Sequence, residues 1–483
     1  MRPARFASRV VRAALIATLG ASIVTCATNP VTGRRELAFV SESQEIQMGR
    51  EYSGQVAQEM GVYPDSGVQA YVSRIGKEMA VLTERPKLPW TFTVMDDPQV
   101  NAFALPGGYI FVTRGILTHM NSEAELASVL GHEIGHVTAR HSVQQMTRQQ
   151  LAQIGLVAGA IASDRVAQNL GVISQGLGVL FLKYSRDDES QADGLGFRYA
   201  LTDGYDVRKM VDMFAILQRV SARAGQRIPE WQSSHPDPGN RIQATEQRIA
   251  KTTVPLDDKK VNRDQLLRVL DGMVYGDNPR QGFFKGDAFL HPDLAFQIDF
   301  PQGWKTVNQP SAVVGLSPKQ DAQLQLSFAG QEAPATTLQK FLGQEGVTAG
   351  QSRSLSIGGN PAAQAPFTAQ TQEGQTLSGL VTFLSYGGST YQLLGITAAS
   401  YATYDRAFQA FAGSFRRLTD PAALNVKPNR VQVTRVSRAM TLAEFNQQNP
   451  STIPIEDLAL INGLADGNAR LAAGASVKRV VAK

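Results

Sequence analysis

Residues 131–141 read GHEIGHVTARH, which places three histidines and one glutamate within eleven residues. Residues four apart on an α-helix return to the same face, offset by only about 40°. His132 and His136 therefore project side by side and can share one metal ion. Glu133 lies one step round the helix, where it can reach a water molecule without being a ligand. The stretch predicts a zinc-binding helix; the alternative is an amphipathic helix with incidental histidines.

The sequence also indicates where this helix begins and whether the third histidine can reach the metal. Ser122 and Glu125 have the spacing of a capping box, so we expect the helix to begin there. His141 lies nine residues after His132, about 180° round the same helix. It can join the ion only if the helix ends first, so we expect it at the surface or behind a ligand. The metzincin pattern would place a histidine at 142, which is Ser142.

A catalytic zinc needs a third protein ligand and an open position for water. The stretch YSRDDESQADGLGFRYA (184–200) puts Glu189 and Asp193 one helical turn apart, some fifty residues after the histidine pair. We predict that Glu189 completes the shell, while Asp193 accepts a hydrogen bond from a ligand imidazole and fixes its tautomer. An acidic pair of this spacing is otherwise a solvated helix face. The small residues around the pair favour the metal site.

One more histidine stands out in SSHPDPGNRI (233–242), where His235 precedes a proline and Arg241 begins another helical run. We expect His235 or Arg241 to face the site, contacting the zinc or stabilising the oxyanion of the reaction. The alternative for His235 is an ordinary loop residue.

The stretch NAFALPGGYIFVTRGIL (101–117) contains two extended runs separated by Pro106-Gly107-Gly108, which predicts a hairpin. Its first strand could hold an extended substrate by β-augmentation, because main-chain hydrogen bonds suit polypeptides of varied sequence. The residues assigned to this role are Asn101, Ala102, Phe103 and Ala104.

The first 25 residues have the pattern of a secretory signal, with four arginines and then the apolar stretch AALIATLGASIVTC (13–26). The only cysteine, Cys26, ends this stretch as in bacterial lipoproteins, where the cysteine is lipidated, although Thr25 departs from their usual small residue. The alternative is a cysteine that is cut away with the signal. ATNP, which follows, lacks the aspartate that retains lipoproteins at the inner membrane. We therefore predict an outer-membrane anchor facing the periplasm. Without the leader the net charge of +5 falls to about +1, so no nucleic-acid partner is expected.

The length of 483 residues predicts about three domains, in a chain of α+β class. Residues 26–255 are expected to form a mainly helical domain with a small sheet, which contains the candidate zinc site, and residues 256–285 a linker. The apolar segment 151–182 is interrupted by polar residues, so it predicts a helical hairpin over a groove rather than a membrane span. Residues 286–418 show alternating strand patterns with one helix near 402–415. Residues 430–483 are expected to fold as strand, helix, helix, strand.

Together these motifs resemble the HtpX/BepA-type zinc metallopeptidases, metallopeptidase family forty-eight, over residues 26–255. The resemblance implies a gluzincin with one zinc ion per chain, held by His132, His136 and Glu189, with Glu133 as general base. The chain lacks the paired transmembrane helices of HtpX-like members and the helical repeats of BepA-like ones. The substrates of either therefore do not transfer. Downstream, GDAFLHPDLAFQIDFPQGWKTVN resembles the opening of a PsbP/MOG-like domain, and residues 430–483 are similar to a LysM peptidoglycan-binding module.

The expected function is metal-assisted hydrolysis of peptide bonds in unfolded or misassembled proteins of the bacterial envelope. In it, Glu133 accepts a proton from a water molecule activated by zinc and returns it to the leaving amine. Two alternatives stay open. The protein could be a latent protease acting mainly as a chaperone, with His235 closing the open zinc position. It could instead be a peptidoglycan-binding factor dominated by residues 430–483.

Overall fold

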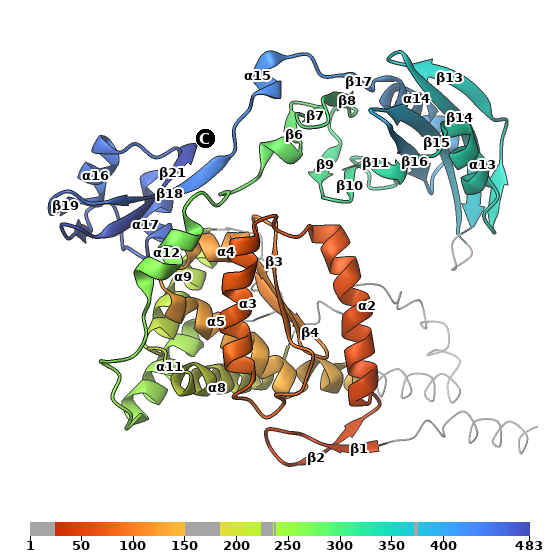
Figure 1. Ribbon diagram of the computed structural model, residues 1–483. Coiled ribbons are helices and arrows are strands. Elements are labelled where there is room, and N and C mark those ends of the chain that lie inside the picture. Colours follow the sequence, from red (N-terminus) through yellow and green to blue (C-terminus); the bar gives the residue numbers. More distant parts are fainter. Residues whose placement is uncertain (1–24, 150–183, 224–234, 236–237, 371–374) are drawn as a thin grey trace, which may run out of the picture.

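The computed structural model describes residues 25–149, 184–223, 235, 238–370 and 375–483, which form three units along the chain (Figure 1). The signal sequence predicted over residues 1–25 and the helical hairpin predicted over 151–182 lie outside the described residues, apart from Thr25. Within the described ranges, no helix combines the length and the apolar character that crossing a bilayer requires.

The first unit is mainly helical, with a three-stranded sheet in the order β3-β5-β4. Its elements are β1 (Thr25–Thr28), β2 (Arg35–Ala38), α2 (Glu42–Met60), α3 (Ser66–Ala80), β3 (Thr91–Met95), β4 (Ala102–Leu105), β5 (Tyr109–Thr113), α4 (Arg114–His119), α5 (Glu123–Thr138), α8 (Arg186–Thr202), α9 (Lys209–Arg223), α11 (Pro238–Lys251) and α12 (Arg263–Leu270). Strands β4 and β5 form the expected hairpin, and its turn uses positive φ angles at Gly107 and Gly108. Strand β3 runs parallel to β5.

Helix α12 falls inside the segment expected to be a linker. Its side chains Leu266 and Leu270 are fully buried in the same hydrophobic core as α3, α5 and α9. The helical unit therefore continues beyond residue 255, because an amphipathic helix is stable where it can bury its apolar face.

The second unit is a sheet of antiparallel pairs whose strands follow the order β12-β14-β15-β16-β11-β10-β9, with β13 also paired to β14. Its main elements are β9 (Lys305–Asn308), β10 (Ala312–Leu316), β11 (Ala322–Gly330), α13 (Pro334–Leu342), β12 (Val347–Ala349), β13 (Arg353–Ile357), β14 (Asn360–Gln370), β15 (Thr376–Tyr386), β16 (Ser389–Thr397) and α14 (Tyr401–Gly413). A smaller sheet, in the order β17-β8-β7-β6, contains β6 (Phe283–Lys285), β7 (Ala288–His291), β8 (Phe296–Asp299) and β17 (Arg416–Arg417).

The helix expected near 402–415 is α14, whereas α13 was not expected. Helix α14 shares one core with β8, β11 and β16, and α13 shares a second with β14 and β15. The sequence of α13 carries only a short apolar face beside two threonines, which gives a weak helical signal.

The third unit contains the expected strand, helix, helix and strand, together with two further short strands. It contains β18 (Asn429–Arg435), β19 (Met440–Thr441), α16 (Leu442–Gln448), α17 (Ile455–Ile461), β20 (Arg470–Leu471) and β21 (Ser476–Ala482). Strands β18 and β21 pair in antiparallel register around a core of its own. In Figure 1 this C-terminal unit (blue) lies against the helical unit beside α12 and α9. Its identity as a LysM module stays a prediction.

Candidate metal centre

Helix α5 carries the histidine pair, and its start is fixed by side chains on either side of the cap. The Ser122 hydroxyl accepts a hydrogen bond from Glu125 N at 3.3 Å, as expected for the N-cap residue. The predicted capping box is only half formed, because the Glu125 carboxylate accepts from Asn121 N at 2.6 Å instead of from Ser122 N. Every residue of α5 is buried, so the helix lies inside the unit rather than on its surface.

Helix α8 approaches α5 closely because small residues face each other between them. A Cβ atom on Gly196 would lie 2.7 Å from His132 N, and one on Gly135 would lie 3.0 Å from Ala192 O. Neither glycine could be exchanged for a larger residue without moving a helix. This close approach brings the acids of α8 within reach of the histidines of α5.

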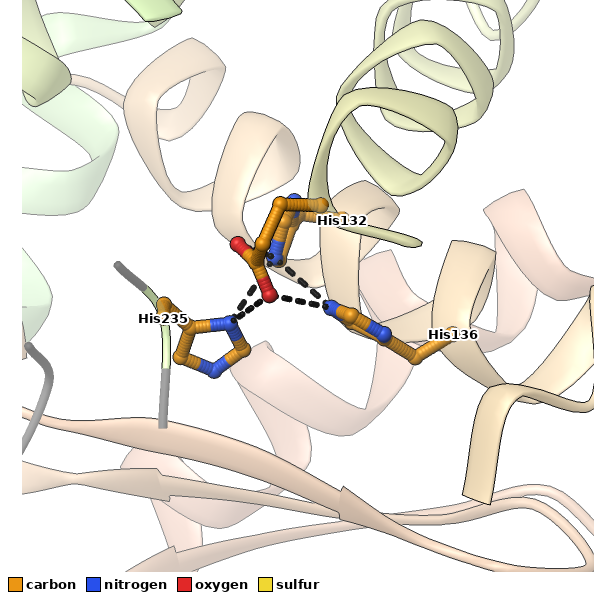
Figure 2. Close-up of side chains that lie close together, drawn as sticks. His132, His136 and His235 are labelled. Atoms are coloured by element: carbon orange, nitrogen blue, oxygen red, sulfur yellow. Dashed lines mark hydrogen bonds and ion pairs between the residues drawn. The ribbon is translucent and has the colours of Figure 1, made fainter. Parts of the chain in front are cut away.

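Four donor groups converge between these helices and residue 235. His132, His136, Glu189 and His235 each offer one ligand atom, and these atoms all lie within 4.8 Å of one another. The Nε2 atoms of His132 and His136 are 3.0 Å apart. The Glu189 carboxylate lies 3.5 Å from the first and 3.4 Å from the second. Figure 2 shows the three labelled imidazoles pointing toward one common volume.

The donor set fits a zinc ion. Ligand atoms about 2.1 Å from a tetrahedral ion lie about 3.4 Å from one another. The separations are 3.2 Å between His132 Nε2 and His235 Nδ1, and 2.9 Å between His235 Nδ1 and the Glu189 carboxylate. All four side chains are buried, so a cation shared between them would offset the cost of burying their polar atoms. The three predicted ligands are brought together, and His235 joins them as a fourth donor.

Electrostatics keep His136 and Glu189 in the forms that bind metal. Burial lowers the pKa of His136 well below its usual value, which leaves the imidazole neutral. Burial alone would raise the pKa of Glu189. The charge of His235 and the hydrogen bonds from His136 and His235 outweigh it and hold the pKa of Glu189 well below its usual range.

The His132 ring is oriented by Asp193, as the sequence predicts. His132 Nδ1 lies 2.9 Å from the Asp193 carboxylate, which leaves Nε2 to face the metal volume. Arg241 donates two hydrogen bonds to the same carboxylate, at 2.6 and 2.8 Å. Burial raises the pKa of Asp193, but the charge of Arg241 and the bond to His132 bring it to about 2.

The His136 ring is oriented by His141, a residue expected at the surface or behind a ligand. His141 is fully buried, so the surface alternative is wrong. Helix α5 ends at Thr138 and Arg140 adopts a positive φ of 59°, so the helical projection of 180° does not apply. His141 Nδ1 lies 2.9 Å from His136 Nδ1, and its Nε2 lies 3.0 Å from the Gln191 side-chain oxygen.

Sequence reasoning missed Tyr184 as part of this site. Its ring stacks on that of His136 with centroids 3.9 Å apart, and its hydroxyl lies 2.9 Å from the Ser142 hydroxyl. The ring walls one side of the donors with apolar surface. The available signal was the position of Tyr184 just before the helix that carries Glu189.

Glu133 is fully buried, and no described group forms a hydrogen bond with either of its carboxylate oxygens. Its nearest ionic neighbour is His235 Nε2, at 3.6 Å. Burial raises the pKa of Glu133, which makes the carboxylate a stronger base than an exposed one. A buried carboxylate without a hydrogen bond destabilises the fold, and such groups are found at functional sites. The position of Glu133 is therefore that expected of a catalytic base.

The two residues proposed for the oxyanion take different places. His235 Nδ1 faces the metal volume, and the charges of Glu189 and Glu133 outweigh burial to raise the pKa of His235. Arg241 lies behind the ligands, with Nη1 3.4 Å from Glu189 and its guanidinium over the ring of Phe214. Arg241 therefore supports the ligands from behind, whereas His235 offers a ligand atom of its own to the metal volume.

The predicted substrate strand lies at an edge of the sheet. Strand β4 pairs only with β5 among the described strands, so its other side is the sheet edge. The side chains of Ala102, Phe103 and Ala104 are buried, and Asn101 N donates to the Thr113 hydroxyl at 3.1 Å. Cys26, proposed as the lipid attachment site, lies in β1 opposite Leu37 of β2.

Two imidazoles and a carboxylate from two packed helices, with a buried glutamate beside them, are the donor set of a metallopeptidase. The chain belongs to peptidase family M48, and the sequence model of that family matches residues 66–249. Over 227 residues it is 28% identical to the beta-barrel assembly-enhancing protease of Escherichia coli, covering 44% of this chain and 46% of that protein. It thus spans less than half of that relative.

A second relative is eukaryotic. The chain is 30% identical over 228 residues to the mitochondrial metalloendopeptidase OMA1 of Schizosaccharomyces pombe, covering 47% of this chain and 67% of that protein. Among solved structures, the chain is similar to the solution structure of cyanobacterial PsbP (CyanoP) from Synechocystis, with 14% identity and a TM-score of 0.23. That similarity covers 27% of this chain and 91% of the other.

Proposed function

We propose that this metallopeptidase is a zinc-dependent endopeptidase of the bacterial cell envelope that hydrolyses unfolded or misassembled envelope proteins. The observation that carries the proposal is the convergence of His132, His136 and Glu189 on one buried volume beside Glu133. A structural zinc site would have no use for a buried carboxylate such as that of Glu133, which neither binds the ion nor orients a ligand.

The reaction needs few groups from this chain. Zinc held by His132, His136 and Glu189 would supply a Lewis acid that polarises the scissile carbonyl and makes water more acidic. Glu133 accepts the proton from the attacking water and returns it to the leaving amine. Asp193 keeps the His132 ring in one tautomer throughout. The edge of β4 would hold the substrate main chain, which suits a protease acting on many sequences.

The test is the Glu133→Gln variant of the full chain, assayed with casein and for bound zinc. General base catalysis contributes about 10²- to 10⁴-fold, so cleavage should fall by that factor while zinc stays bound. Glu133 is not a ligand, so atomic absorption should give the same metal content as for the wild type. Wild-type cleavage by this variant would remove Glu133 as the base.

The envelope location rests on Cys26 and on the residues that follow it. Asn29 is buried, and its side chain donates to Ala139 O at the end of α5, at 3.2 Å. Because Asn29 follows Cys26 closely in the chain, a lipid on Cys26 would hold the end of the catalytic helix near the membrane surface. Substrates would be polypeptides at that surface. A palmitate label that is present on the wild type and absent from Cys26→Ala is the expected result; equal labelling would exclude the anchor.

Peptidoglycan is the proposed partner of residues 430–483. Their fold order of strand, helix, helix and strand supports this role, which is otherwise inferred from resemblance. Full-length protein should sediment with purified peptidoglycan at physiological salt. Protein that stays in the supernatant would contradict the role.

A second candidate function is a latent protease that mainly holds unfolded substrates. It is favoured by His235, whose Nδ1 atom lies as close to the other donors as they lie to each other. Four protein ligands fill a tetrahedral zinc shell and leave no position for water. His235→Ala should then raise casein cleavage and leave substrate holding unchanged. Unchanged or lower cleavage would favour the active enzyme.

A further inference from the structure

A second buried cluster of charge lies at the other end of α5, where the C-terminal unit meets the α4–α5 junction, residues 118–122. Lys478 of β21 has an exposed fraction of 0%. Its ammonium group donates to Thr118 O at 2.9 Å and to Met120 O at 2.6 Å. The last carbonyls of a helix have no partner within it and favour a cation. Lys478 therefore caps the end of α4 from a strand about 360 residues away.

The counter-charge of Lys478 is on α5 itself. Burial lowers the pKa of Lys478, and the attraction of Glu125 opposes this shift. Burial raises the pKa of Glu125 to about 7, and the charge of Lys478 opposes it in turn. Glu125 also accepts from Asn121 N at 2.6 Å. The pair thus holds both kinds of main-chain group in the junction: Lys478 holds carbonyls, and Glu125 holds an N–H.

Further contacts make the C-terminal unit a fixed support rather than a tethered module. Arg263 donates to Asn121 O and to Ser476 O, each at 3.0 Å, and so joins the junction to β21. Arg219 of α9 donates to Leu464 O at 2.6 Å. Leu460 of α17 is buried in the core of the helical unit.

The junction leads directly into the catalytic helix. Helix α5 begins at Glu123, and nine residues separate this start from His132, which is about 13 Å along the axis. A buried α-helix moves as one body, so a displacement at its start reaches the donors. Misplacement of about 1 Å can reduce a rate by about 100-fold.

We propose that Lys478 is a positioning residue for peptide hydrolysis, which fixes the α4–α5 junction from the C-terminal unit and so places Glu133 and the two histidines. Cleavage then depends on residues 430–483 as a brace, whatever ligand they bind. This inference rests on the proposed peptidase function.

The experiment compares full-length wild type with Lys478→Met, which keeps the size of the side chain and removes its donor. The matched control is Arg479→Met, because Arg479 is the next residue of β21 and bonds only Pro450 O and Gln432, within the C-terminal unit, among the described contacts. We expect kcat on a fluorogenic peptide to fall about 10- to 100-fold for Lys478→Met, with KM unchanged. Zinc affinity, from chelator competition, should fall about tenfold. Arg479→Met should match the wild type in both.

A double variant separates positioning from charge balance. In Glu125→Gln/Lys478→Met no buried charge is left unpaired, so the melting temperature should recover toward that of the wild type. The carbonyls of Thr118 and Met120 still lack their donor, so kcat should stay low. Recovery of kcat together with the melting temperature would overturn the proposal, as would a folded Lys478→Met with wild-type kcat and zinc affinity.

Two further outcomes are an inactive wild type and a Lys478→Met variant that does not fold. A wild type that does not cleave any peptide would contradict the proposed function, and zinc affinity would still test the brace. Should Lys478→Met not fold, Lys478→Gln provides the same readouts, because its amide keeps one donor without the charge. We expect a smaller fall in kcat and zinc affinity for this variant, and unchanged values would overturn the proposal.

Discussion

The two ends of helix α5 carry buried charge in opposite arrangements. In the metal centre, the ligand atoms of His132, His136, Glu189 and His235 converge on one volume, where a single cation could bind all of them. At the α4–α5 junction, the Lys478 ammonium meets two carbonyl oxygens, so a donor meets acceptors. The first arrangement offers ligand atoms to a cation from outside, whereas in the second the protein supplies the cation itself. Convergence of like groups marks a binding site, and convergence of unlike groups marks a structural contact.

The largest effect should come from removing one of the converging acceptors. Glu189→Ala should weaken zinc binding by more than about 100-fold, because partners that only orient ligands are already worth about 10- to 100-fold. Atomic absorption after dialysis measures this loss. Asp187→Ala is the control, since Asp187 is an exposed acid in the same turn of α8. Zinc content equal to that of the control would remove Glu189 from the ligand set and erase the contrast between the two ends.

The metal centre was largely predictable because its signals are local. The spacing of His132 and His136 fixes a shared helix face, and that of Glu189 and Asp193 does so on a second helix. The small residues around the acids indicated that those helices could pack closely. The sequence left the role of His235 open between metal and oxyanion, because a loop residue has no periodicity from which to read a direction.

Other parts could not be predicted, since they depend on contacts far apart in the chain. His141 was projected along a helix that in fact ends at Thr138. Lys478 lies in the stretch SVKRVV, where a lysine beside an arginine indicates a solvent-facing position. Its burial comes from α4, more than 350 residues earlier. In the structure neither Lys478 nor Val477 is exposed, which breaks the alternation of a half-buried strand.

A smaller effect should follow from changing a partner that orients a ligand. Asp193→Asn keeps the size of the side chain and removes the charge beside His132, so zinc affinity should fall by about 10- to 100-fold. His141→Gln should have a weaker effect, because His136 is then deprived of a neutral partner rather than a charged one. Chelator competition measures both. A His141 variant that loses more affinity than the Asp193 variant would show that the neutral partner matters more than the charged one.

The smallest effect concerns pH and the junction. His119, the last residue of α4, is buried, and its Nδ1 donates to Gly115 O at 2.8 Å. Burial, with the charge of Lys478 added, lowers the pKa of His119 from 6.5 to about 4. The unfolded chain therefore takes up a proton at a higher pH than the folded one. The stability from neutral His119 is fully present above pH 6.5 and is lost as the pH falls toward 4.

At pH 5.5 this loss should amount to about 1.4 kcal/mol of the free energy of unfolding, or about tenfold in the equilibrium constant. His119→Asn keeps a donor toward Gly115 O and does not titrate, so its stability should fall less between pH 7.5 and 5.5. Urea unfolding of both proteins at the two pH values measures the difference. Protonation of His119 would put a second cation beside Lys478, with Glu125 as the nearby counter-charge and Tyr275 against the ring. If both proteins lost the same free energy of unfolding, protonation of His119 would not destabilise the junction. The junction would then accept a second positive charge beside Lys478.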